Sequence, residues 1–355
     1  MERNQNGSMY LKTLGLDPEN QEAPIAFVES EKRMDGLFYR RNHFPYPEVD
    51  SDLLDIGGLT ERNLRLTVAE LKELPARTVT VVLKCAGNKR SLFSKKTFGE
   101  QWGKGALSLG TWTGVPLRSL LEKAGLKDGV QEIVFNGHDE GMQPGFDKTE
   151  CYGRSLPLEK AIHPDTIVAY AYNGERIPEC HGAPLRLIVP GWYAMASVKW
   201  LRTIQASADH FEGPFQTDDY VYYPHEDSDE DAEPVRQLRV NSTIQQPLDM
   251  AKAEKGEQIV KGIAWTGIGH IEKVEVSVDS GCTWEAAELE DGETEGVDYG
   301  WVPWSFKWHA EKAGIYKIFS RAKDSEGRVQ PGEACWNRKG YGYNAIDRVK
   351  LKVLK

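Results

Sequence analysis

Short apolar runs that end at Gly, Asn or Pro recur through the N-terminal part of the chain. The run at 78–85, TVTVVLKC, is β-branched and apolar, and it predicts a buried strand leading directly into Ala86-Gly87-Asn88. Similar runs at 132–139, 166–172 and 183–190 predict further strands. Apolar residues at helical spacing near residues 70 and 120, each followed by Pro or Gly, predict two helices. This part of the chain is therefore predicted to mix strands and helices.

The pattern changes after an acidic run at 225–234, HEDSDEDAEP. Like charges at this density repel one another and stay solvated, so residues 225–235 are predicted to form a linker or an exposed loop. Beyond this run, alternating apolar and polar positions separated by Gly- and Asp-rich turns predict an all-β sandwich. We therefore expect an α+β domain over residues 1–224 and a β domain over residues 236–355.

Composition narrows the classes of partner. A length of 355 residues suits two domains, and 40% hydrophobic residues is typical of globular chains. The formal net charge of −10 argues against binding to nucleic acid or to an anionic membrane surface. An anionic ligand would then need a local cluster of Arg and Lys. No apolar run reaches the length of a membrane span, and residues 1–20 lack the apolar stretch of a signal peptide, so we expect a cytoplasmic protein.

Cys85 differs from the other four cysteines of the chain. An odd, sparse set of cysteines is no disulfide framework, and no zinc-type spacing is present. Cys85, however, ends a predicted buried strand on a Gly-containing turn, with Lys89 and Arg90 close behind it. Neighbouring cations favour a thiolate, which can bind a redox metal or act as a nucleophile. The spacing alone leaves a buried structural cysteine equally open.

The hexapeptide Cys85-Ala86-Gly87-Asn88-Lys89-Arg90 resembles C-A-G-N-R-R, the molybdenum-ligand motif of the sulfite oxidase family. Further segments resemble that family in order along the chain: 38–45, 112–117, 135–139, 152–157, 172–174, 181–186, 189–200, 264–267, 276–284 and 321–324. The resemblance covers about residues 26–350 and is closest to the haem-free, two-domain plant and bacterial members. It implies an α+β molybdopterin-binding domain with the sulfite oxidase fold, followed by an immunoglobulin-like dimerisation domain.

The resemblance also implies a cofactor, molybdenum held by a pyranopterin dithiolene (molybdopterin), and assigns the residues that bind it. Cys85 takes the place of the metal's protein ligand. The cofactor-binding positions are Arg41, Asn42, His43, Asp139, Ser155, His181, Arg186, Ser197 and Lys199. Their chemistry suits the ligand, because Arg186 and Lys199 can bind a phosphate and Asp139 can accept from pterin N–H groups.

On the substrate side, the resemblance assigns catalytic positions to Arg41, Arg90, Tyr220 and Lys339. The three cations are expected to face a small oxyanion, and the Tyr220 hydroxyl to donate a hydrogen bond beside the metal. Lys339 stands where the family has an arginine, so the charge is kept but the bidentate fork is lost. This departure weakens the case for tight sulfite binding.

The resemblance implies oxidation of sulfite to sulfate by oxo transfer. The alternative within the same chemistry is reduction of another oxyanion or S-oxide, such as nitrate. From a different class, the chain could be a non-catalytic cofactor-binding or adhesion-type protein. No haem motif is present, so electrons are expected to pass to oxygen or to a separate carrier protein. A homodimer is expected.

Overall fold

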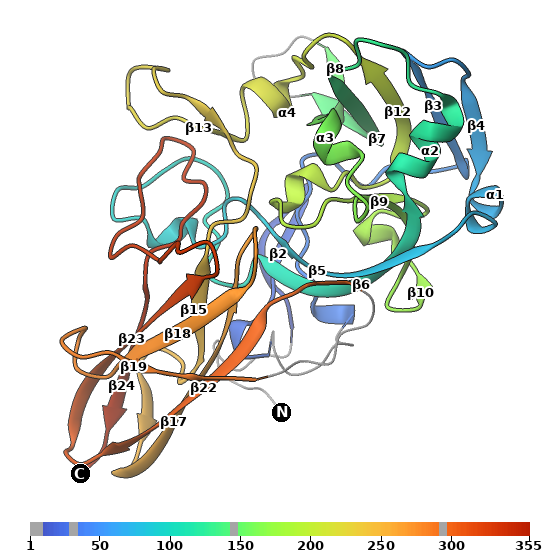
Figure 1. The fold of residues 1–355 in the computed structure, drawn as a ribbon. Coiled ribbons are helices and arrows are strands. Elements are labelled where there is room, and N and C mark those ends of the chain that lie inside the picture. Colours follow the sequence, from blue (N-terminus) through green and yellow to red (C-terminus); the bar gives the residue numbers. More distant parts are fainter. Residues whose placement is uncertain (1–9, 28–34, 143–147, 291–296) are drawn as a thin grey trace.

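The chain folds into two β-rich parts (Figure 1), and the computed structural model describes residues 10–27, 35–142, 148–290 and 297–355. Strands of the C-terminal half gather at the lower left of the view, and the N-terminal half lies at the upper right. In the described residues no helix combines the length and apolar character that crossing a bilayer requires.

The N-terminal part is built on two sheets. The first has the order β10-β9-β6-β5-β21, with β11 also paired to β9. Its strands are β5 (Arg77–Lys84), β6 (Leu107–Pro116), β9 (Ile167–Tyr172), β10 (Glu175–Arg176), β11 (Arg186–Ile188) and β21 (Val297–Tyr299). The second has the order β4-β3-β12-β7-β8. Its strands are β3 (Leu53–Gly58), β4 (Leu64–Thr67), β7 (Glu132–Met142), β8 (Thr149–Pro157) and β12 (Leu201–Ser207).

Of the four predicted strands, two match closely, one is longer than predicted and one is shorter. β5 and β9 occupy the expected segments, and the strand predicted at 132–139 extends to Met142. The strand predicted at 183–190 is wrong in length, because only Arg186–Ile188 pairs with β9. Pro184 and Pro190 flank this strand, and proline has no N–H to donate to a ladder.

The helices are few and short. They are α1 (Val68–Lys72), α2 (Leu117–Ala124), α3 (Leu158–Ala161) and α4 (Pro214–Thr217), with 3-10 turns at Ile25–Phe27, Asp35–Leu37, Arg90–Leu92, Glu179–His181 and Ala194–Ala196. Thr67 caps α1 through a reciprocal pair of bonds with Glu70, of 3.1 and 2.8 Å. α2 buries Leu117, Leu120, Leu121 and Ala124 at helical spacing. Both predicted helices are confirmed, but the part expected to be α+β is mostly strand.

The C-terminal part is all-β, as predicted. Its sheets have the orders β15-β17-β22-β20 and β16-β24-β23-β18-β19. The strands are β15 (Asn241–Gln246), β16 (Ala251–Ala253), β17 (Gly256–Trp265), β18 (Ile271–Ser277), β19 (Glu285–Ala286), β20 (Glu288–Leu289), β22 (Val302–Ala310), β23 (Gly314–Asp324) and β24 (Asp347–Val353). Side chains of both sheets share one buried cluster, so the core lies between them. The immunoglobulin-like class stays a prediction.

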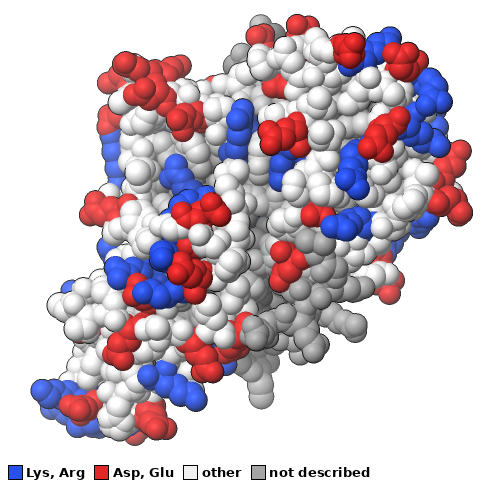
Figure 2. Space-filling view, viewed as in Figure 1, with Lys and Arg blue, Asp and Glu red and all other residues white. Residues whose placement is uncertain are grey.

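The acidic run forms an exposed loop between two paired strands, β13 (Val221–Tyr222) and β14 (Glu233–Pro234). Figure 2 shows acidic side chains gathered over this loop. Ion pairs of Lys95 with Glu226 and of Arg338 with Asp229 hold it against the rest of the chain. The two parts are also joined by β21, which follows the C-terminal strand β20 yet pairs in parallel with β5. The domain limits at 224 and 236 stay a prediction.

Two remaining strands, β1 (Lys12–Leu16) and β2 (Glu19–Glu22), form a small antiparallel hairpin near the N-terminus. Gln21 bridges from this hairpin to Arg40 through backbone bonds of 2.9 and 2.8 Å. The hairpin therefore braces the segment that contains Arg41, Asn42 and His43.

Candidate active site

Strand β5 delivers Cys85 onto a tight turn. The Cys85 amide donates to Ala106 O at 2.9 Å, and its carbonyl accepts from Asn88 N at 3.0 Å. The Asn88 side chain accepts from Ala106 N at 3.0 Å, which fixes the turn to β6. A Cβ at Gly87 would lie 2.8 Å from the Arg90 guanidinium carbon, so a larger residue here would displace the Arg90 side chain. The turn leaves Cys85 buried at the edge of a pocket.

The pocket brings together most of the predicted site residues from distant parts of the chain. Ten of them line it: Arg41, Asn42, His43, Cys85, Asp139, His181, Arg186, Ser197, Lys199 and Tyr220. They come from the loop before β3, the turn after β5, strand β7, the segments around β11 and the approach to β13. The five segments themselves lie far apart in the sequence, so the fold brings them together to form the site.

Two of the cationic side chains that line the pocket are the buried Arg186 and the partly buried Lys199. Arg186 donates from Nη1 to His181 O at 3.0 Å, and Lys199 donates to Arg41 O at 3.1 Å and also to the Asn42 side chain. Burial lowers the pKa of Arg186 to about 10 and that of Lys199 to about 7, with the Asp139 carboxylate opposing the second shift. Burial in turn raises the pKa of Asp139 to about 6, against the attraction of Lys199.

Two buried polar atoms of this group have no hydrogen-bond partner among the described residues, Arg186 Nε and Asp139 Oδ1. Buried polar atoms are nearly always paired, so these two point to a polar ligand. Arg186 and Lys199 suit a phosphate, while Asp139 suits ring N–H donors. The residues present therefore fit the pterin and phosphate groups of a molybdopterin.

A second group links Arg41, His43 and Tyr220. Arg41 Nη2 lies 3.2 and 3.3 Å from the two ring nitrogens of His43, and His43 Nε2 lies 2.7 Å from the Tyr220 hydroxyl. Burial and the nearby Arg41, Lys199 and Arg154 cations hold the pKa of His43 well below its usual range, so the ring is neutral. Burial raises the pKa of Tyr220 well above its usual range, so the hydroxyl keeps its proton. The tautomer of His43 then decides whether that proton is free for a ligand.

Three predicted site residues do not line the pocket. Arg90 is buried, donates to Glu100 O at 2.9 Å and lies 5.0 Å from the centre of the Tyr341 ring. Lys339 binds Asp219 at 3.0 Å and is partly exposed. Ser155 is buried within β8. Their roles in binding substrate or cofactor stay predictions.

Several pocket residues escaped the sequence reasoning. Phe38, Tyr39, Ala86, Tyr152, Cys180, Ala194 and Met195 line the pocket beside the predicted set. Tyr39 and Tyr152 each lie two residues before an arginine, Arg41 and Arg154, within segments that resemble the family. Aromatic residues in apolar runs, however, usually belong to a core. Their closeness to an arginine in the sequence was the signal that could have assigned them to the pocket.

The described residues hold no group of three or more His, Cys, Asp or Glu side chains that could bind a metal by themselves. Cys85 is a single soft ligand, so a metal here would need its other ligands from a cofactor. Together with side chains that suit a phosphate and a pterin, this geometry fits the class of molybdopterin oxidoreductases.

Comparison with known proteins agrees with this class. Residues 43–215 match the model of an oxidoreductase molybdopterin binding domain, and residues 232–354 match a Mo-co oxidoreductase dimerisation domain. The chain is 36% identical to sulfite oxidase of Gallus gallus, covering 93% of this chain and 75% of that protein. It is 35% identical to mitochondrial sulfite oxidase of Rattus norvegicus over 95% of this chain, but spans only 64% of that protein's length.

Two further matches are a nitrate reductase and a solved structure. An NADH nitrate reductase of Solanum lycopersicum is 33% identical over 97% of this chain and 41% of its own length. The crystal structure of the sulfane dehydrogenase SoxCD from Paracoccus pantotrophus has a TM-score of 0.83 at 24% identity, covering 100% of this chain and 93% of that one. The chain belongs to the sulfite oxidase family of molybdenum-cofactor oxidoreductases.

Proposed function

We propose that this protein oxidises sulfite to sulfate at a molybdopterin-bound molybdenum held by Cys85. One observation carries the proposal: Cys85 shares a single pocket with Arg41, His43 and Tyr220, which can hold a small oxyanion beside a metal. The sulfite oxidases of chicken and rat supply the choice of substrate.

The cofactor, when bound, would supply a metal that takes up two electrons and gives the substrate one oxygen atom, which water then replaces. The chain positions the reactants and compensates charge. The Arg41 guanidinium, which lies beside both ring nitrogens of His43, offers donors to an anionic oxygen, and the protonated Tyr220 hydroxyl contacts His43 Nε2. Arg186 and Lys199, which line the same pocket, would compensate the negative charge of the cofactor. Arg186 and Tyr220 are buried, which strengthens their interactions because water is excluded.

The test is steady-state turnover of sulfite by the molybdenum-loaded protein, with ferricyanide as acceptor and then with oxygen. Sulfite turnover with either acceptor supports the proposal. Turnover with both indicates an oxidase, and turnover with ferricyanide alone indicates a dehydrogenase that needs a separate carrier. Absence of turnover at full molybdenum loading contradicts it.

The second candidate is reduction of another oxyanion, with nitrate as the first to test. The position of Lys339 favours this candidate. Lys339 stands at the family's arginine position, but it is paired with Asp219 at 3.0 Å and does not line the pocket, which weakens the case for sulfite. The similarity to the tomato nitrate reductase agrees with this possibility. Turnover of nitrate with reduced viologen, without turnover of sulfite, would replace the first proposal by the second. A non-catalytic cofactor-binding protein would show neither activity.

We also propose that the protein is a homodimer in the cytoplasm. The match of residues 232–354 to a dimerisation domain supports the homodimer. Light scattering at micromolar concentration should give twice the monomer mass, and a particle of monomer mass would contradict the dimer. Fractionation of the source cells tests the location, and recovery of the protein outside the cytoplasm would overturn it.

A further inference from the structure

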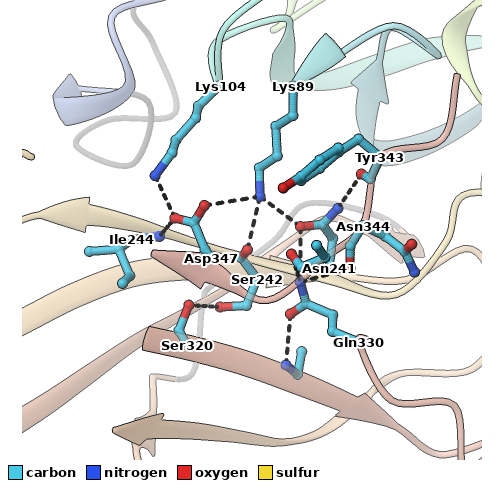
Figure 3. A network of polar contacts seen from close by, with 12 residues as sticks. Lys89, Lys104, Asn241, Ser242, Ile244, Ser320, Gln330, Tyr343, Asn344 and Asp347 are labelled. Atoms are coloured by element: carbon cyan, nitrogen blue, oxygen red, sulfur yellow. Dashed lines mark hydrogen bonds and ion pairs between the residues drawn. The ribbon is translucent and has the colours of Figure 1, made fainter. Parts of the chain in front are cut away.

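Lys89 lies on the turn that carries Cys85, yet its side chain ends inside the C-terminal part (Figure 3). Its ammonium group donates to Asn241 Oδ1 at 2.9 Å and to Ser242 O at 3.1 Å, and lies 3.6 Å from Asp347 Oδ1. Lys89 and Asn241 are fully buried, and Asp347 is 2% exposed. The turn is thus tied to strands β15 and β24 by a buried charge.

The partners of Lys89 are themselves fixed. Asp347 accepts from Ile244 N at 2.8 Å, and Asn241 donates to Tyr343 O at 3.0 Å. Gln330 donates to Asn241 Oδ1 at 3.3 Å and to Ala345 O at 3.0 Å, as Figure 3 shows in part. Both side chains that face the Lys89 ammonium group, Asn241 and Asp347, are therefore held by further bonds, and such networks are rigid when their members are paired.

The backbone at Lys89 gives a second, independent observation. Its φ is 66°, in the left-handed region where residues other than glycine are strained. Such a conformation persists where the surroundings over-determine it. Here the Lys89 amide donates to Gly103 O at 2.7 Å, while the side chain is anchored in the network. The turn is therefore held in shape from both sides.

A backbone hydrogen bond also joins the turn to the C-terminal part, at the residue that follows Cys85. Gly342 N donates to Ala86 O at 2.8 Å, directly after Cys85. The segment that supplies this bond also supplies Tyr343, whose carbonyl accepts from Asn241. The network of Lys89 and the residue next to Cys85 are therefore connected through one short segment.

We propose that Lys89 is a positioning residue, through which the C-terminal part sets the orientation of Cys85 toward the metal. It acts through the turn and touches neither substrate nor cofactor, since it does not line the pocket. The inference rests on the proposed molybdenum site, although not on sulfite being the substrate. A purely structural role predicts a loss of stability alone, whereas a positioning role predicts a changed metal environment in the folded protein.

Lys104 provides a matched control. It also binds Asp347, at 2.7 Å, but it lies outside the turn and is partly exposed. Lys104→Met and Lys89→Met each remove one cation from Asp347. Of the two lysines, Lys89 lies on the turn that carries Cys85. Lys89→Arg restores the charge with the residue of the family's usual motif.

The experiment compares the molybdenum-loaded variants by visible absorption per bound molybdenum, by melting temperature and by kcat and KM for sulfite. For Lys89→Met we expect a shifted spectrum and a kcat lowered about tenfold to hundredfold, because small displacements at a reacting centre are costly. KM should stay within about threefold of wild type, since the pocket cations are untouched. Lys104→Met should lower the melting temperature but keep the spectrum, and Lys89→Arg should recover most of the kcat.

Wild-type spectra for both Lys89→Met and Lys104→Met, with equal losses of stability, would overturn the proposal. If Lys89→Met does not fold, Asp347→Asn decides by the same measurements: a shifted spectrum supports the positioning role and an unchanged one refutes it. If the wild-type protein does not turn over sulfite, the proposed function fails while the spectra still decide this inference.

Discussion

Replacement of Lys199 by Met should flatten the pH dependence of stability in the cofactor-free protein. Folding takes the Lys199 ammonium out of water, and burial lowers its pKa from 10.5 to about 7. Between these values the unfolded chain binds a proton that the folded chain does not, so stability rises with pH. The slope is at most about 1.4 kcal/mol per pH unit, or about 2–3 kcal/mol between about pH 7 and about pH 9.

Asp139 contributes in the opposite direction over a lower range. Burial raises its pKa from 3.8 to about 6, so its contribution to stability is full below the lower value and is lost as the pH rises toward the higher one. The two contributions together lower the free energy of unfolding of the cofactor-free protein most near pH 6 to 7. An anionic cofactor would keep Lys199 protonated, so the rise above pH 7 should disappear in the loaded protein.

Urea denaturation of the cofactor-free protein at a series of pH values measures this effect. Tryptophan fluorescence is a suitable signal, because Lys199 Nζ lies 4.1 Å from the centre of the Trp200 ring. The control is Lys317→Met at an exposed position, which should follow the wild-type profile. Parallel profiles for Lys199→Met and wild type across this range would refute the reasoning.

Three further substitutions test the site. Cys85→Ser should abolish molybdenum retention while leaving the far-UV circular dichroism unchanged, and a variant that keeps a full complement of metal would contradict the ligand role. Tyr220→Phe should lower kcat/KM for sulfite by about 10²-fold, as loss of one placed donor does. Its melting temperature should change little, because the ring still stacks on Tyr341 with centroids 5.2 Å apart, and an unchanged kcat/KM would exclude the hydroxyl from catalysis. Lys339→Arg should lower KM for sulfite by about tenfold if the fork reaches the anion, whereas an unaltered KM would mean that Asp219 still holds the side chain.

The strand that precedes Cys85 is predictable because its central residues, Thr-Val-Thr-Val-Val-Leu, are β-branched or apolar, and its last six positions are buried. Helix α2 is equally clear, since its apolar spacing ends at Gly125, which takes a φ of 72°. The pairing of β21 with β5 is not predictable in this way. It joins segments far apart in the chain, and a local pattern carries no information on its neighbour across the sheet.

The site shows the same division. The cationic residues and Cys85 follow from a resemblance that covers most of the chain, and the fold brings Arg186, Lys199 and Asp139 into one pocket. Sequence does not tell where a long side chain ends. Lys339 turns to Asp219, and Lys89 reaches the C-terminal part, because charge partners and packing available only in the folded chain decide both directions.

The most direct test of the central claim is a single anaerobic turnover. Sulfite is added to the oxidised, molybdenum-loaded protein, and the visible spectrum and the sulfate formed are followed together. The account predicts a rapid spectral change with about one sulfate per bound molybdenum, because oxidation of one sulfite delivers the two electrons that the metal takes up. No spectral change on addition of sulfite, together with reoxidation of the chemically reduced protein by nitrate, would contradict it.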